Sequence, residues 1–437
     1  MDLSMRDRTI SVIFCLFVTI YPFLIISWEK TFYYTNVKAY YLIGFSILLC
    51  ALISLFSDKR KISNVQLEQL GKAEWLLLLL LLLVGVSTVQ SLQISLVGYL
   101  TEHNGILVMF SYALLFMIAS RFVHPDWHQK IINFLAISAS LCSVYGIAQH
   151  YGTNLLSQDI VMDYAYKNRS FSFFDNPDYF GAFLVLAVIM VFTLYLAADK
   201  RINELLYLFI LCLLGVALLG SETRSAWLGS LIGLLMLSVL VAWKRKDLWK
   251  KWIAVFIVII LTFVVMNIFS QQDYLARAKS IVEDVHKIAT NVDSNTAGAT
   301  RWYIWKITLP LIKEYFWFGS GPNTFHLVFH PGIDPDFWKY LSGGPIYDVN
   351  NDYLHIALTL GVPALMVYLL FLAVILYNGF HSAKVLSGER QIIAYGCLAA
   401  ITGYLVQAFF NISVVSVAPY FWIILGISYS YTVTSNK

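Results

Sequence analysis

Long runs of apolar residues alternate with short polar segments along almost the whole chain. Each run approaches the roughly 20 residues that a helix needs to cross the hydrocarbon core of a bilayer. A helix also pairs its own backbone N–H and C=O groups, so the pattern predicts an all-α polytopic membrane protein with about twelve transmembrane helices. The runs lie at residues 9–27, 40–57, 74–92, 104–121, 131–149, 178–197, 203–220, 225–243, 252–269, 353–377, 391–410 and 413–431.

One polar segment, residues 270–352, is much longer than the others. A structureless connection of this length would be unusual, and apolar positions at helical spacing predict an amphipathic helix over residues 271–288. A second helix is predicted over residues 300–325, ended by the turn sequence GSGPN. The predicted organisation is one integral membrane domain, with helices one to nine in residues 1–269, a large loop, and helices ten to twelve in residues 353–437.

The composition agrees with this assignment. The chain has 437 residues, of which 59% are hydrophobic and 13% are charged, and its mean hydropathy is +0.69. A soluble domain usually carries about a quarter charged residues, and it could not bury so much apolar surface. The composition therefore excludes a soluble fold.

The placement of positive charge predicts how the chain is oriented. With the N-terminus in the cytoplasm, the inner segments hold 18 lysines and arginines, and the short outer loops hold five. The positive-inside rule then predicts cytoplasmic N- and C-termini and places the loop 270–352, the connection around 150–178 and the turn Gly220–Trp227 outside. The first apolar run lacks a convincing small-residue cleavage site, so it is predicted as a retained helix and not as a signal peptide.

Three arginines, Arg169, Arg224 and Arg301, lie on this predicted outer face. A guanidinium stays charged and presents a planar fork that binds phosphate oxygens, so the three are candidates for holding a diphosphate group. Each arginine taken alone is also explained as an interfacial anchor that binds lipid phosphates or a nearby carboxylate. Arg224 fits that explanation least, because it lies in a turn of a few residues beside Glu222.

Four phrases of the sequence resemble those of one family and occur along the chain in the family's order, with the Arg301 phrase third and the NNDYL phrase last. RSFSFFDNPDYFGAF is similar to an arginine followed by a GTFGNPNYLG-like turn, and GSETRSAWLG is similar to a TSSRGAWLG-like turn. NNDYLHIALTLGVPAL resembles the pattern HNxYLxxxxxxGxxG leading into a span. The remaining phrase, R…W…PLxGxGPxxF, is matched by Arg301, Trp305, Gly319, Gly321, Pro322 and Phe325. Over about residues 140–430 the chain thus resembles the O-antigen ligase and O-antigen polymerase superfamily of membrane glycosyltransferases.

The resemblance implies a glycosyltransferase that acts on the outer face of the cytoplasmic (inner or plasma) membrane, in surface polysaccharide biosynthesis. Its donor would be a glycan on an undecaprenyl-diphosphate carrier, and its acceptor a glycan, lipid, cell-wall polymer or protein. Membrane lipids are the other expected partners, and nucleic acid is not one. No nucleotide sugar, metal or other cofactor is implied, because cleavage of the glycosyl diphosphate supplies the energy. The resemblance assigns Arg169, Arg224 and Arg301 to the departing diphosphate.

The chain departs from the family at the residue expected to activate or orient the acceptor. Family ligases have histidine at the first position of HNxYL, where this chain has Asn350. A neutral amide can orient a hydroxyl by hydrogen bonding, but it cannot take its proton. The predicted catalytic residues are therefore Asn350, Asp352 and Glu222, and Asp348 is a further candidate for the base.

His355 is also a candidate, although about 500° of helical rotation separates it from Asn350 and directs it elsewhere. It is better explained as a histidine inside the helix bundle, where Asp352, three residues earlier, could pair with it. Glu222 is likewise explained by a local ion pair with Arg224.

Ligase chemistry is slightly preferred to polymerisation of repeat units, although polymerases of the superfamily are less uniform in the histidine. An inactive form would also explain Asn350. A transporter or flippase is the main alternative to an enzyme, but the two halves show no repeat and the polar groups gather at one face. A metal-dependent oligosaccharyltransferase would need an acidic cluster, for which only Asp334–Phe337 (DPDF) offers a close pair. Cell-wall glycan polymerases of the shape, elongation and division group share a related architecture without these phrases.

Overall fold

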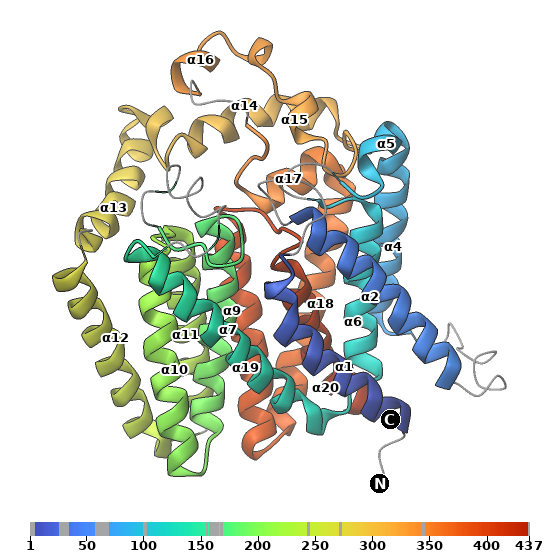
Figure 1. Cartoon of the computed structure of the whole chain (residues 1–437). Helices are drawn as coiled ribbons and strands as arrows, with labels where there is room; N and C mark the ends of the chain where they lie inside the picture. The colour runs from blue at the N-terminus through green and yellow to red at the C-terminus, as the bar shows by residue number, and fades with distance from the viewer. Residues whose placement is uncertain are drawn as a thin grey trace.

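The computed structural model describes residues 5–25, 35–56, 70–98, 103–153, 156, 166, 169–242, 245–270, 273–341 and 346–435. Over this part of the chain the regular elements are helices, with no strand. Long helices form a bundle, and shorter helices cover one of its ends (Figure 1). Several basic residues that entered the orientation argument lie outside the described residues, namely Lys30, Lys59, Arg60, Lys61, Lys167, Lys244 and Lys437.

The predicted apolar runs correspond to helices, with the tenth run divided between two, and the predicted all-α polytopic membrane fold is confirmed. Among the described residues, nine helical segments are long and apolar enough to cross a membrane, and α6 is a shorter apolar helix. The bundle helices are α1 (Met5–Ile20), α2 (Thr35–Phe56), α4 (Lys72–Thr88), α6 (Ile106–Arg121), α7 (His128–His150), α9 (Pro177–Ala197), α10 (Arg201–Gly220), α11 (Arg224–Ala242), α12 (Trp249–Phe269), α18 (Val362–Val385), α19 (Gly388–Ala408) and α20 (Ala418–Ser435).

Helix α9 lies at the centre of the bundle and packs against α7, α10, α11 and α19. Every residue of α9 except Asp178 is buried, as expected for a helix that is apolar on all sides. Its neighbours α11 and α19 approach closely because small residues meet there: a Cβ on Gly229 would lie 2.6 Å from the carbonyl oxygen of Gly403. The core therefore holds α9, and with it Asp178, in a fixed position.

The large loop folds into a cap made of α13 (Tyr274–Thr290), α14 (Arg301–Glu314), α15 (Phe325–Val328) and α16 (Phe337–Tyr340), which lies over one end of the bundle (Figure 1). The cap has its own apolar cluster, which includes Tyr303, Phe325 and Phe337. The predicted helix over residues 271–288 corresponds to α13. The second predicted helix is too long, because α14 ends at Glu314 and the chain then turns back toward the bundle.

The predicted tenth span is wrong as a single helix. It consists of a short helix α17 (Asp352–Thr359) and the long helix α18, separated at Gly361, whose φ is 93°. Residues 316–321 fill the break: the amide of Val362 donates to the carbonyl of Phe316 at 2.8 Å, and Gly321 donates to Thr359 at 2.9 Å. These bonds satisfy backbone groups that the break exposes, as irregular backbone near a membrane requires.

Candidate functional site

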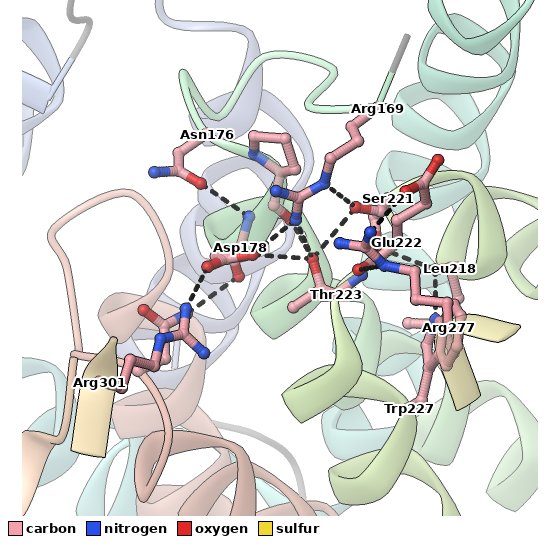
Figure 2. A network of polar contacts seen from close by, with 12 residues as sticks. Arg169, Asn176, Asp178, Leu218, Ser221, Glu222, Thr223, Trp227, Arg277 and Arg301 are labelled. Atoms are coloured by element: carbon pink, nitrogen blue, oxygen red, sulfur yellow. Dashed lines mark hydrogen bonds and ion pairs between the residues drawn. The ribbon is translucent and has the colours of Figure 1, made fainter. Parts of the chain in front are cut away.

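Two of the three predicted arginines bind the same carboxylate. Arg169 precedes α9 and Arg301 begins α14, yet their Nη2 atoms lie 2.8 and 2.7 Å from the two oxygens of Asp178 (Figure 2). All three side chains are about one-fifth exposed. A single carboxylate therefore joins the central helix of the bundle to the cap and draws two guanidinium groups together.

Local sequence explains why Asp178 can do this. Asn176 caps α9 by accepting the N–H of Asp178 at 2.8 Å, and Pro177 occupies the first turn, where its missing N–H costs nothing. The hydroxyl of Thr223 lies 3.2 Å from the Asp178 carboxylate, and Arg169 Nε donates to the carbonyl of Ser221 at 3.0 Å (Figure 2). The turn before α11 is thus part of the same network.

Arg224, the third predicted arginine, binds α13 and not Glu222. Its Nη1 lies 2.6 Å from Asp284 and 2.9 Å from the hydroxyl of Ser280. The predicted local pair between Glu222 and Arg224 is wrong, because Glu222 has a left-handed backbone (φ 52°) and its carboxylate pairs at 3.0 Å with Arg277 of α13. Arg277 Nε also donates to the Glu222 carbonyl at 2.8 Å (Figure 2).

The sequence analysis missed Asp178, Arg277 and Asp284. A signal was present for the last two, since they lie seven residues apart and share one face of the amphipathic helix that was predicted. Asp178 was quoted only as part of a turn phrase. Burial lowers the pKa of Arg277, which the nearby Glu222 carboxylate opposes, so α13 contributes a guanidinium to a partly dry site.

A cavity of about 210 Å³ separates α13 and α14 from the start of α11. Arg224 and Arg301 both line it, with Asp284 as the acidic group. The rest of its wall is largely apolar or aromatic and includes Trp302, Trp305 and Phe410. Such a cavity suits an amphiphilic anion, because it offers fixed cations beside apolar surface.

The segment before α17 is fastened to α14. Trp305 Nε1 donates to the carbonyl of Val349 at 3.0 Å, one turn beyond Arg301. Asn350 has a left-handed backbone (φ 50°), which asparagine tolerates well, and its N–H donates to Asp348 Oδ1 at 2.9 Å. Within the described residues, the half-buried Asn350 amide side chain makes no hydrogen bond.

Two carboxyls near the start of α17, Asp348 and Asp352, have a pKa that burial raises to about 6. At Asp348, the effect of burial is opposed by the Asn350 N–H and the charge of Arg301, which act to lower the pKa, while the charge of Asp178 acts to raise it. These influences also show that Asp348 is within electrostatic reach of Arg301 and Asp178.

Asp352 and His355 lie on the other side of α17. Asp352 accepts two hydrogen bonds of 3.0 Å from the amide and hydroxyl of Ser413, in the connection between α19 and α20. The His355 ring packs beside Phe325 with centroids 6.3 Å apart, and the side chain is buried as predicted. Both line a small cavity of about 80 Å³ among α4, α6, α17 and α18, away from the arginines.

No group of three His, Cys, Asp or Glu side chains that could hold a metal ion occurs within the described ranges.

Residues 208–369 match the family model Wzy_C, described as O-antigen ligase. The match contains Arg224, the whole cap, Arg301 and Asn350, and it excludes Arg169 and Asp178. No curated protein shows significant similarity to the chain. The match confirms the resemblance for the three phrases that it contains, and the phrase that begins at Arg169 lies outside it.

Proposed function

We propose that this chain is a glycosyltransferase of the O-antigen ligase and polymerase superfamily that takes a glycan from an undecaprenyl-diphosphate carrier. The match of residues 208–369 to the O-antigen ligase family model supports this proposal. The acceptor is a lipid, a cell-wall polymer or a protein. The reaction takes place on the outer face of the cytoplasmic membrane, under the cap, and both termini lie in the cytoplasm. The distribution of Lys and Arg supports this orientation.

The observation that carries the proposal is the convergence of Arg169, Arg224 and Arg301 at one end of the bundle. A guanidinium has five N–H donors. Arg301 uses one nitrogen for Asp178, and Arg224 uses one nitrogen for Asp284 and Ser280. The carboxylates therefore hold the arginines in place and leave donors for phosphate oxygens. Fixed cations of this kind stabilise the charge that develops on a departing diphosphate.

The predicted catalytic residues have different surroundings, which suggest different roles. Asn350 orients the acceptor hydroxyl with its amide side chain. Glu222 holds Arg277, and its buried Oε1 has no partner within the described residues. Asp352 fixes the start of α17 through Ser413. In this proposal Glu222 and Asp352 act by positioning, and no metal or other cofactor takes part.

Asn350 also supports a second candidate function, polymerisation of glycan repeat units. Polymerases of the superfamily keep the outer arginines and are less uniform in the histidine that ligases use. The donor and the diphosphate chemistry are the same, and only the acceptor differs.

Deletion of the gene, followed by analysis of carrier-linked glycans, tests the proposal and separates its two forms. Long chains left on the carrier indicate a ligase, and single repeat units indicate a polymerase. The wild-type gene supplied in trans is the control and should remove either species. If no glycan accumulates on the carrier, both forms are wrong.

The variant Arg224→Lys tests diphosphate binding in the same strain. Lysine keeps the positive charge but loses the planar fork, so we expect about a tenfold or greater loss of transfer. Full activity of this variant would show that Arg224 does not bind the diphosphate in bidentate fashion.

A further inference from the structure

The backbone N–H of Asn350, the position at which family ligases have histidine, binds a neighbouring carboxylate. Asp348 Oδ1 accepts the N–H of Asn350 at 2.9 Å, so a side chain two residues earlier folds over the left-handed turn. Trp305 holds the intervening Val349 from the side of α14. The Asp348 carboxylate is therefore hydrogen-bonded to the backbone of residue 350. The helix that begins with Arg301 fixes the position of this turn through Trp305.

Among the described carboxylates of this region, Asp348 is the one that no other side chain binds. Within the described residues its one hydrogen bond is with the Asn350 N–H, and it has no ion pair. Each of the other acidic side chains nearby is bound by another side chain: Asp178 by Arg169 and Arg301, Asp284 by Arg224, Glu222 by Arg277, and Asp352 by Ser413.

The charges that face Asp348 suit a proton acceptor. Burial disfavours its ionised form, Arg301 favours that form, and the ionised Asp178 opposes Arg301. A base works best when its pKa lies near the working pH, because it is then ionised and still basic enough to accept a proton. Burial raises the pKa of the Asp352 carboxyl to about 6 as well, but Asp352 is bound by Ser413 and lines the small cavity away from the arginines.

We propose that Asp348 is the general base of the transfer reaction, in the role that histidine has in family ligases. This inference rests on the function proposed above. The acceptor hydroxyl gives its proton to the Asp348 carboxylate while its oxygen forms a bond to the anomeric carbon of the donor sugar. The bond between that carbon and the diphosphate oxygen breaks, and its electron pair leaves with the diphosphate among the arginines. Asp348 then releases the proton to water, which completes the balance.

The experiment uses membranes of the deletion strain that carry wild-type or variant protein. The probe is the carrier-linked glycan extracted from that strain, and the acceptor is the one present in the membranes. We expect Asp348→Asn to lower the transfer rate by about a hundredfold or more, within the range typical of general-base catalysis. Asp336→Asn is the matched control, because Asp336 is an exposed carboxylate of the same loop, and it should retain full activity.

A second variant distinguishes a base from a structural residue. Adding Asn350→His to Asp348→Asn should restore transfer at least tenfold, because histidine tolerates the left-handed backbone and supplies a base. The pair Asp348→Asn with Asn350→Gln should stay inactive. Near-wild-type activity of Asp348→Asn, or a loss that Asn350→His does not rescue, would overturn the inference. The proposed function is judged separately, by whether wild-type membranes consume the extracted glycan.

Discussion

The first turns of α9 and α17 begin in the same way and differ in charge. An asparagine caps each helix, Asn176 in α9 and Asn351 in α17, and an aspartate lies within two residues of each cap. In α9 that aspartate, Asp178, binds two guanidinium groups. In α17 the corresponding Asp352 binds the neutral groups of Ser413.

Asp348, just before α17, also differs from Asp178 in the groups that bind its carboxylate. Asp348 lies near Arg301 but accepts its hydrogen bond from a backbone N–H, so its charge is poorly stabilised and its pKa is raised to about 6. Residue type alone does not distinguish Asp178 from Asp348. The two differ in the number of cations within bonding distance. Asp178 binds two arginines and holds them in place, whereas Asp348 binds none among the described residues and is the proposed proton acceptor.

The largest expected effect is at the α9 end. Asp178→Ala leaves Arg169 and Arg301 close together without their carboxylate. Removing one partner of a buried ion pair costs about 3–5 kcal/mol, and displaced arginines no longer stabilise the leaving group. We expect a clear fall in the thermal unfolding temperature of the purified protein in detergent and a loss of transfer of about a hundredfold or more.

Asp178→Asn, which keeps the size and loses the charge, should fall between wild type and Asp178→Ala in both measurements. Asp126→Asn is the matched control, because Asp126 pairs with Arg390 where both side chains are more than half exposed, and such pairs contribute little. Wild-type transfer by Asp178→Ala would show that the arginine pair is not part of the site.

A charge exchange between Arg224 and Asp284 has an intermediate effect and separates two roles of Arg224. The single variant Arg224→Asp places two carboxylates together and should loosen α13, as measured by faster hydrogen exchange in that helix. Combining Arg224→Asp with Asp284→Arg restores the pair and should return α13 to slow exchange. Transfer should remain at least about tenfold below wild type, because the guanidinium no longer comes from α11.

Restored transfer in the exchanged variant would mean that Arg224 serves to hold α13 and does not bind the donor. The pair Glu222 and Arg277 provides the comparison, since it holds the same helix from the turn before α11. Exchange of those two charges should affect α13 in the same way.

The sequence was sufficient to predict the helical membrane fold, because each apolar run reports its own helix through local composition. It failed at the tenth span, since the break at Gly361 depends on residues 316–321. That partner segment lies about forty residues away, and apolar periodicity continues through the break. The early end of α14 has the same cause, because the chain leaves the helix to reach this contact.

The site was predictable to a smaller extent. Arg169, Arg224 and Arg301 were identified from their phrases and from the chemistry of guanidinium groups, and the structure brings them to one end of the bundle. Their partners were not predictable, because they lie far away in the sequence. Asp178 and Arg301 are 123 residues apart, and Arg224 and Asp284 are 60 residues apart. Sequence proximity suggested Glu222 for Arg224, and the left-handed turn at Glu222 turns that carboxylate toward Arg277 instead.

The smallest expected effect is on the stability of the folded protein when Asp348 is replaced. Replacing Asp348 should raise that stability, whereas replacing Asp178 should lower it. The ordinary pKa of the Asp348 carboxyl is 3.8, and folding raises it to about 6. Between these values the unfolded chain has lost the proton and the folded protein still binds it. The stability of the folded protein therefore falls as the pH rises from about 4 to about 6, and it stays at the lower level above that range.

Asp348→Asn removes this penalty, because the amide carries no charge to bury. Its unfolding temperature in detergent should exceed that of wild type by a few degrees at about pH 8, and the difference should vanish at about pH 4. Asp336→Asn should show no such dependence. A carboxylate kept for packing would give the reverse result, with the asparagine variant less stable at about pH 8. Gain of stability together with loss of transfer is the combination expected where a fold keeps a costly charge for its chemistry.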